Sequence, residues 1–199
     1  MFRRQFCIGA LAGTAAAAAS TPLSAAVNTE IRAVTGDGVE KAIERVVVDD
    51  LRKSLRGGLL LPTDDGYDKA RKLWSGIDKR PALIARCTGP ADVRTAVNFA
   101  REHDLLTAVK CGGHNAAGKG SCDNGIMIDL SPLQGIRVEP DNGVSWVAGG
   151  SLLGAMDHEN MAHGVVTTAG TVSHTGVGGL TLGGGFGRVV RSGMTVTDD

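Results

Sequence analysis

Two glycine-rich segments hold the residue types that could bind a phosphate ester. The first follows an expected strand and reads V-K-C-G-G-H-N from Val109 to Asn115. Adjacent glycines at that place let successive backbone N–H groups point into one concavity, an anion nest suited to pyrophosphate. The second reads G-T-V-S-H-T-G-V-G-G-L-T-L-G-G-G-F-G from Gly170 to Gly187. It has few large side chains, so a flat, extended ligand could lie along its backbone. Together the segments predict a site for a dinucleotide or another phosphate ester.

Other kinds of site fit these residues less well. The glycine spacing departs from the G-x-G-x-x-G pattern of NAD-binding folds. Cys111, His114 and Cys122 match no four-ligand zinc pattern, and we expect no metal. Ser173 has no recognisable acid–base partner, which argues against a hydrolase. A disulfide between Cys111 and Cys122 stays open, because nothing in their spacing compels it.

Two helices are expected before residue 80, and we assign them to a packing layer without chemistry. Asp37 and Glu40 have the spacing of a capping box. The apolar stripe of that helix runs from Val39 to Leu55, and two glycines then stop it. A shorter helix is expected from Asp65 to Trp74.

Strands and helices interleave irregularly after residue 80, which indicates an α+β fold rather than a regular βαβ array. Strands are expected at 82–87, 106–110, 126–130, 136–138 and 144–148. One helix is expected to begin at Pro90, and another covers Ser151–His163 and stops at Gly164. Asp129 is expected to make a structural hydrogen bond. The remaining helix histidines, His103, His158 and His163, have the positions of surface or capping residues.

The first 26 residues read as an export signal. Arg3 and Arg4 precede an uncharged, alanine-rich stretch, and small residues at 24 and 26 form a cleavage site after Ala26. The arginine pair resembles a twin-arginine signal, which predicts a periplasmic or secreted protein that is exported already folded. The stretch from Phe6 to Ser20 is shorter than the roughly 20 apolar residues that a membrane span needs, so we expect no stable membrane insertion.

Composition excludes further classes. The 199 residues hold 21 Lys+Arg and 21 Asp+Glu, and this balance argues against a nucleic-acid binder. With 42% hydrophobic and 21% charged residues, the chain is an ordinary globular one. Glycine is enriched: 20 of the 29 glycines follow Lys110, where they can turn the backbone or let it approach a ligand closely.

Four motifs together resemble a known family. They are C-G-G-H-N from Cys111, G-I-M-I-D-L-S from Gly125, V-A-G-G-S-L-L-G-A-M-D-H from Val147, and the long glycine segment from Gly170. In this order they are similar to the FAD-binding domain of the vanillyl-alcohol oxidase and p-cresol methylhydroxylase (PCMH) superfamily, in its bacterial berberine-bridge-enzyme-like branch. The resemblance covers residues 80–199. It implies a PCMH-type domain there, preceded by a short helical segment at 27–79.

The resemblance implies FAD as the cofactor and names its site. His114 matches the histidine that the family bonds covalently to the 8α-methyl group of the flavin. Lys110 replaces the usual arginine, and Val172 stands where plant members bind the flavin through a second cysteine, so a single bond is expected. His174 either tunes the flavin or makes a structural hydrogen bond. The implied cofactor-binding residues are Cys111, Gly112, Gly113, His114, Asn115, Gly170, Thr171, Val172, Thr175, Gly176, Gly179, Gly183, Gly184, Phe186 and Gly187.

The resemblance also implies an activity. Such an enzyme passes a hydride from a hydroxyl-bearing carbon of a small-molecule substrate to flavin N5, and an acceptor such as dioxygen takes the electrons. Family members continue beyond the second glycine segment, so we expect a domain incomplete at its C-terminus and assign no catalytic residue. The alternative is a non-catalytic fragment that binds FAD weakly or not at all.

Overall fold

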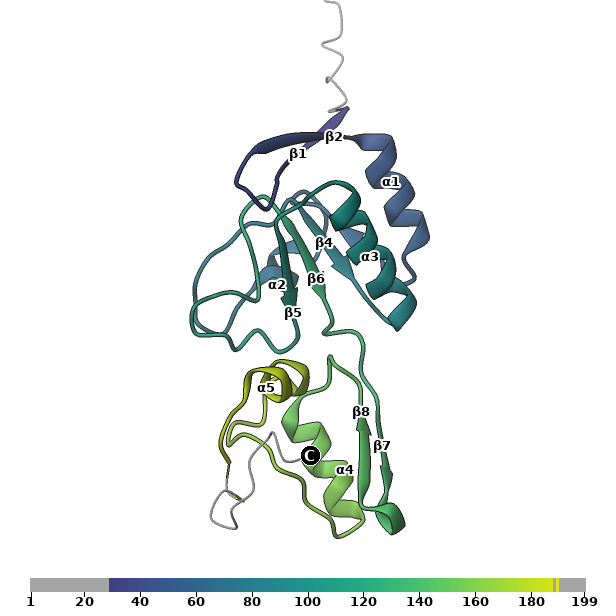
Figure 1. Cartoon of the computed structure of the whole chain (residues 1–199), viewed down its shortest axis with the longest axis vertical. Coiled ribbons are helices and arrows are strands. Elements are labelled where there is room, and N and C mark those ends of the chain that lie inside the picture. The colour runs from purple at the N-terminus through teal and green to yellow at the C-terminus, as the bar shows by residue number, and fades with distance from the viewer. Residues whose placement is uncertain (1–28, 188, 190–199) are drawn as a thin grey trace, which may run out of the picture.

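The computed structural model describes residues 29–187 and residue 189. The predicted export signal, Met1–Ala26, lies outside the described residues. The described chain forms two stacked units (Figure 1). The first holds a four-stranded sheet with three helices and a β-hairpin, and the second holds a two-stranded sheet with two helices.

The larger sheet has the strand order β3-β4-β6-β5. Its strands are β3 (Leu59–Leu60), β4 (Leu83–Arg86), β6 (Ile126–Asp129) and β5 (Thr107–Lys110). The last three run parallel, and β3 pairs antiparallel with β4. The strands expected at 82–87, 106–110 and 126–130 are therefore confirmed to within a residue or two at each end.

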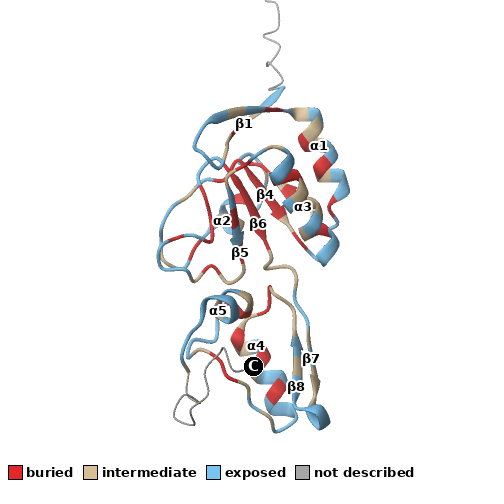
Figure 2. Ribbon diagram, in the orientation of Figure 1, coloured by how far each residue is buried: buried red, intermediate tan, exposed pale blue. Residues whose placement is uncertain are grey.

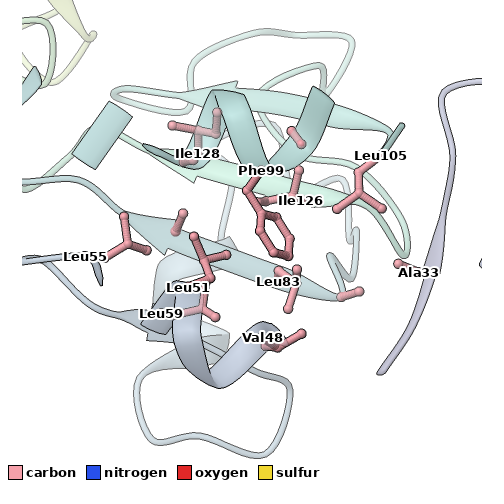
Figure 3. Close-up of a cluster of buried hydrophobic side chains, with 14 of the residues drawn as sticks. Ala33, Val48, Leu51, Leu55, Leu59, Leu83, Phe99, Leu105, Ile126 and Ile128 are labelled. Carbon is pink, nitrogen blue, oxygen red and sulfur yellow. The ribbon is translucent and has the colours of Figure 1, made fainter. Parts of the chain in front are cut away.

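Both faces of this sheet are buried. On one face, Leu83, Ile126 and Ile128 pack against Val48 and Leu51 of α1 (Arg45–Ser54) (Figure 3). Helix α3 (Pro90–Glu102) adds Phe99 to the same core, and its start at Pro90 is as predicted. On the other face, Ile84 and Met127 pack with Tyr67 of α2 (Tyr67–Arg71). Strand β6 is buried along its whole length and β4 at Leu83, Ile84 and Ala85, because side chains of period two reach both layers (Figure 2).

The expected helix over residues 37–55 is wrong in its first part. Strands β1 (Glu30–Val34) and β2 (Glu40–Glu44) form an antiparallel hairpin, and only Arg45–Ser54 is helical. Gly38 has a φ of +82° and closes the turn through its N–H bond to the Thr35 carbonyl. Val39 and Val46 are exposed rather than part of a buried stripe, while Ile43 points inward with period two. Pairing between the strands therefore outweighs the capping box that the sequence suggested.

The second unit follows β6. Strands β7 (Ile136–Glu139) and β8 (Val144–Val147) pair antiparallel around a 3-10 turn at Pro140–Asn142. Helix α4 (Leu153–Ala162) packs on this pair, and Gly164 follows it with a φ of +69°, as the predicted stop requires. Helix α5 (Val177–Gly183) lies inside the second glycine segment, where no helix was expected.

The described cysteines are all free thiols: Cys87, Cys111 and Cys122. The bridge left open between Cys111 and Cys122 is therefore not formed in the described part of the chain. The same residues include no helix both long and apolar enough to cross a lipid bilayer.

Candidate functional site

The first glycine segment begins where three parallel strands end together. Arg86, Lys110 and Asp129 are the last residues of β4, β5 and β6, and the pairing register places Asp129 opposite both of the others. Ligands of open α/β sheets bind beyond the carboxyl ends of such strands. The segment after Lys110 therefore lies at the edge of the sheet where a site is expected.

A buried charge cluster forms the floor of this edge. The Asp129 carboxylate is 1% exposed, and its oxygens lie 3.6 Å from Lys110 Nζ and 3.7 Å from Arg86 Nε. Its Oδ1 also accepts a hydrogen bond of 3.1 Å from the Ser131 N–H. Asp129 thus makes the structural hydrogen bond expected of it, and it holds the Lys110 ammonium beside the first glycine segment.

The two glycine segments touch backbone to backbone. A Cβ built on Gly112 would lie 2.4 Å from the Gly176 nitrogen, and one built on Gly176 would lie 2.3 Å from Cys111 Sγ. The second segment is held in place by α4, since the N–H groups of Leu153 and Gly154 donate to the carbonyls of residues 175 and 173. Only residues without a side chain allow this approach.

Several backbone N–H groups of the first segment lack a hydrogen-bond acceptor among the described residues. Within the part of the chain that the structure describes, the N–H groups of Gly112, Gly113 and His114 donate to no protein acceptor. Cationic groups stand beside them, because Lys110 and Lys119 both line the same space. Free backbone donors next to lysines are the features that bind phosphate oxygens.

A cavity of about 480 Å³ lies between the two segments, within the range of small-molecule sites. The residues lining it come from the end of β5 and the first segment, from the loop that follows, and from α5 and the residues on either side of that helix. They are Val109, Lys110, Cys111, Gly112, Gly113, His114, Asn115, Ala116, Lys119, Gly120, Thr175, Gly176, Gly179, Leu180, Gly183 and Gly184.

Three rings meet at the rim of this cavity. His114 Nε2 lies 2.5 Å from Nδ1 of His174, and Trp74 stacks on His114 with ring centroids 5.1 Å apart and planes 14° apart. The Trp74 N–H also donates to the Gly113 carbonyl. Burial, and to a smaller extent the neighbouring His174, lowers the pKa of His114 below its ordinary value. The His114 imidazole is therefore neutral around pH 7 and keeps a lone pair on one nitrogen.

The structure brings together ten of the fifteen residues named as a cofactor site. These ten line the cavity: Cys111, Gly112, Gly113, His114, Asn115, Thr175, Gly176, Gly179, Gly183 and Gly184. Gly170, Thr171, Val172, Phe186 and Gly187 do not line it. Gly170 and Thr171 line a neighbouring hollow beside α4, and Val172 and Phe186 are exposed.

Sequence reasoning did not assign several residues in and around the site, among them Trp74, Lys119 and Leu180. Trp74 was assigned to a packing helix, but it lies in a turn after α2 and contacts His114. Lys119 reaches the cavity because the Asn115 side chain accepts its N–H and turns the loop back. Leu180 lines the cavity from the unexpected α5. No local sequence pattern indicates that Trp74 belongs to the site. For Lys119 there is such a signal: Asn115, directly after C-G-G-H, favours a turn that brings the following loop back to the site.

Comparison with known proteins identifies the family to which this chain belongs. The family model described as "FAD binding domain" matches residues 81–198. The chain belongs to the FAD-binding domain family. The predicted resemblance and the PCMH-type fold are thereby confirmed, and berberine-bridge-enzyme-like proteins are among the relatives.

Individual relatives of this FAD-binding chain are oxidoreductases. An FAD-linked oxidoreductase of Dictyostelium discoideum is 37% identical over 77% of this chain and 34% of its own length. The crystal structure of 6-hydroxy-D-nicotine oxidase from Arthrobacter nicotinovorans matches with a TM-score of 0.71 and 31% identity, over 73% of this chain and 32% of that one. A chitooligosaccharide oxidase matches with a TM-score of 0.68 and 25% identity, over 76% and 33%. This chain spans about a third of the length of the relatives it matches.

Proposed function

We propose that the cavity between the glycine segments binds FAD with its pyrophosphate on the first segment, and that His114 forms one covalent bond to the flavin. The N–H groups of Gly112 and Gly113, which have no acceptor among the described residues, are the observation that carries the first part. They lie at the carboxyl edge of the sheet, beside two lysines that line the cavity. The residues present therefore fit a doubly charged pyrophosphate.

The geometry of His114 supports the covalent bond. Its ring lines the cavity at the end of the glycine pair, so it is positioned beyond the phosphate-binding amides. Its pKa is lowered by burial, which keeps one ring nitrogen unprotonated and able to bond to carbon. Val172 carries no sulfur and lies outside the cavity, so the proposal includes a single bond.

The proposed reaction is oxidation of a small molecule at a hydroxyl-bearing carbon. FAD, when bound, supplies the hydride acceptor at N5 and passes the electrons to an acceptor such as dioxygen. The relative titled as a chitooligosaccharide oxidase supports a hydroxyl-bearing substrate. The chain's own residues bind and orient the cofactor, and the described cavity lining holds no carboxylate or tyrosine that could act as a base.

The experiment separates cofactor binding from turnover. The purified protein is incubated with FAD, freed of excess flavin and examined by visible absorption. We expect a stoichiometric yellow complex. Simple sugars, oligosaccharides and aliphatic alcohols are then added without oxygen, and loss of the oxidised flavin spectrum reports hydride transfer. A colourless protein overturns FAD binding, whereas a yellow protein that none of these compounds bleaches overturns only the proposed substrate class.

We also propose that the protein is exported. The support is the twin-arginine pattern at Arg3 and Arg4 and the small residues before position 27. An enzyme that receives its cofactor in the cytoplasm needs a route for folded proteins, which that signal supplies.

A further inference from the structure

The contact between His114 and His174 restricts which nitrogen of His114 is free to react. His114 Nε2 and His174 Nδ1 are 2.5 Å apart, so one nitrogen donates a hydrogen and the other accepts it. The rings are tilted by 40° with centroids 4.5 Å apart, so they meet edge to edge rather than stacking. Within the described part of the chain, Nδ1 of His114 has no hydrogen-bond partner.

Only one of the two possible arrangements leaves a neutral His114 with an available lone pair. If His174 donated, Nε2 of His114 would use its lone pair as the acceptor and Nδ1 would carry the hydrogen. If His114 donates from Nε2, its Nδ1 keeps a lone pair that no described residue engages. The second arrangement alone is compatible with bond formation to carbon by His114 as the structure holds it.

Trp74 removes the remaining freedom of the ring. It stacks on His114 nearly in parallel, and its own backbone N–H is tied to the Gly113 carbonyl at 3.1 Å. Stacking on Trp74 fixes the plane of the His114 imidazole. The contact between Nε2 and His174 turns the Nε2 edge toward the second glycine segment, so the edge that carries Nδ1 points away from it. The direction of Nδ1 is then determined by groups from three separate parts of the chain.

We propose that His174 is a positioning residue that holds His114 as its Nε2–H tautomer, so that Nδ1 is the atom bonded to the flavin. This inference rests on the covalent bond proposed above. In the step, a C–H bond of the flavin 8α-methyl group is replaced by a bond from that carbon to Nδ1. The methyl proton and, after the bond has formed, the Nε2 proton both leave to solvent. The two electrons reduce the isoalloxazine ring, from which dioxygen takes them to form hydrogen peroxide.

The test measures the rate of covalent incorporation rather than substrate turnover. Purified protein is mixed with FAD in air, and timed samples are precipitated with acid and separated on a denaturing gel, where protein-bound flavin fluoresces. His174→Ala should slow incorporation by about 10- to 100-fold, the usual cost of losing a partner that orients a histidine. The His174→Asn variant should restore most of the rate, because an amide oxygen can accept from Nε2. The neighbouring Ser173→Ala is the matched control and should incorporate flavin as the wild type does.

Two further measurements make the result decisive. Melting temperature and noncovalent FAD affinity, measured without oxygen, should be unchanged in His174→Ala, which separates slow bonding from misfolding. NMR of the isolated flavin peptide from the wild type should show linkage through Nδ1. Incorporation by His174→Ala at the wild-type rate, or linkage through Nε2, overturns this inference while the covalent bond stands. A wild type that binds FAD and never retains it after acid overturns the proposed covalent bond, and this inference with it.

Discussion

The substitution Gly112→Ala should open the two glycine segments and weaken FAD binding. The new Cβ would lie 2.4 Å from the Gly176 nitrogen and 3.1 Å from the His174 carbonyl oxygen. Ordinary contact begins near 3.4 Å, so the segments must separate by about 1 Å. Overpacking of this kind costs about 1–3 kcal/mol. If this free energy is lost from FAD binding, the dissociation constant for FAD rises about 5- to 150-fold.

The assay is a titration of the protein with FAD, followed by quenching of flavin fluorescence, together with a thermal melt. Gly36→Ala is the matched control, because a Cβ at that glycine meets nothing within 4 Å and its position is far from the cavity. The control should bind FAD as the wild type does. If Gly112→Ala keeps both the wild-type affinity and the wild-type melting temperature, the close approach of the two segments is refuted.

Three further predictions concern other parts of the chain. Asp92→Asn should destabilise the fold by about 2 kcal/mol, measured by urea unfolding, because the buried carboxylate accepts hydrogen bonds from the backbone N–H groups of Arg56, Gly57 and Thr88. Burial opposes ionisation of Asp92, but those bonds hold its pKa below the ordinary value. Its stabilisation is therefore present above about pH 4 and is lost on further acidification. An equal loss of unfolding free energy below pH 4 in the wild type and in Asp92→Asn would contradict this account. Burial raises the pKa of Cys87 to about 12 and that of Cys122 to about 11, so brief alkylation of the native protein at neutral pH should modify Cys111 before Cys87 and Cys122, as read by peptide mass spectrometry. Earlier modification of Cys87 would argue against the buried core. Changing Arg3 and Arg4 to lysine together should retain the precursor in the cytoplasm, measured by cell fractionation, and unchanged export would exclude the twin-arginine route.

The sequence predicted the three parallel strands of the larger sheet because they carry a strong local signal, whereas the two-residue strand β3 was not expected. The segments before Arg86, Lys110 and Asp129 are short apolar runs bounded by glycine, proline or polar residues, and each forms a strand, buried in β4 and β6 and alternately buried and exposed in β5. The helix from Pro90 was equally clear, since proline fixes its first turn. These signals do not depend on partners distant in the sequence.

The misses have the opposite origin. The β1–β2 hairpin depends on pairing between Ile31 and Ile43 and on a glycine turn, and the stretch from Val39 also satisfies helical spacing. Helix α5 is rich in glycine, which has low helix propensity, and its stability comes from its anchor on Ser151 and from Val177 in the second core.

The candidate site was predicted in part for the same reason. The anion nest after Lys110 follows from two adjacent glycines after a strand, so it is visible in the sequence. Contact between Gly112 and Gly176 joins residues 64 positions apart, and stacking of Trp74 on His114 joins residues 40 positions apart. Such contacts depend on the tertiary fold, so residue spacing in the sequence does not predict them.

Acid precipitation of the FAD-loaded protein tests the central claim most directly. Wild type and His158→Ala, whose histidine is exposed on α4, should both retain flavin after precipitation and washing. The tryptic peptide that contains His114 should carry the added mass of FAD. His114→Ala should bind FAD in solution and release all of it in acid. If the wild type also releases all its flavin, the covalent bond to His114 is contradicted, and if the wild type never acquires FAD, the assignment of the cavity itself is contradicted.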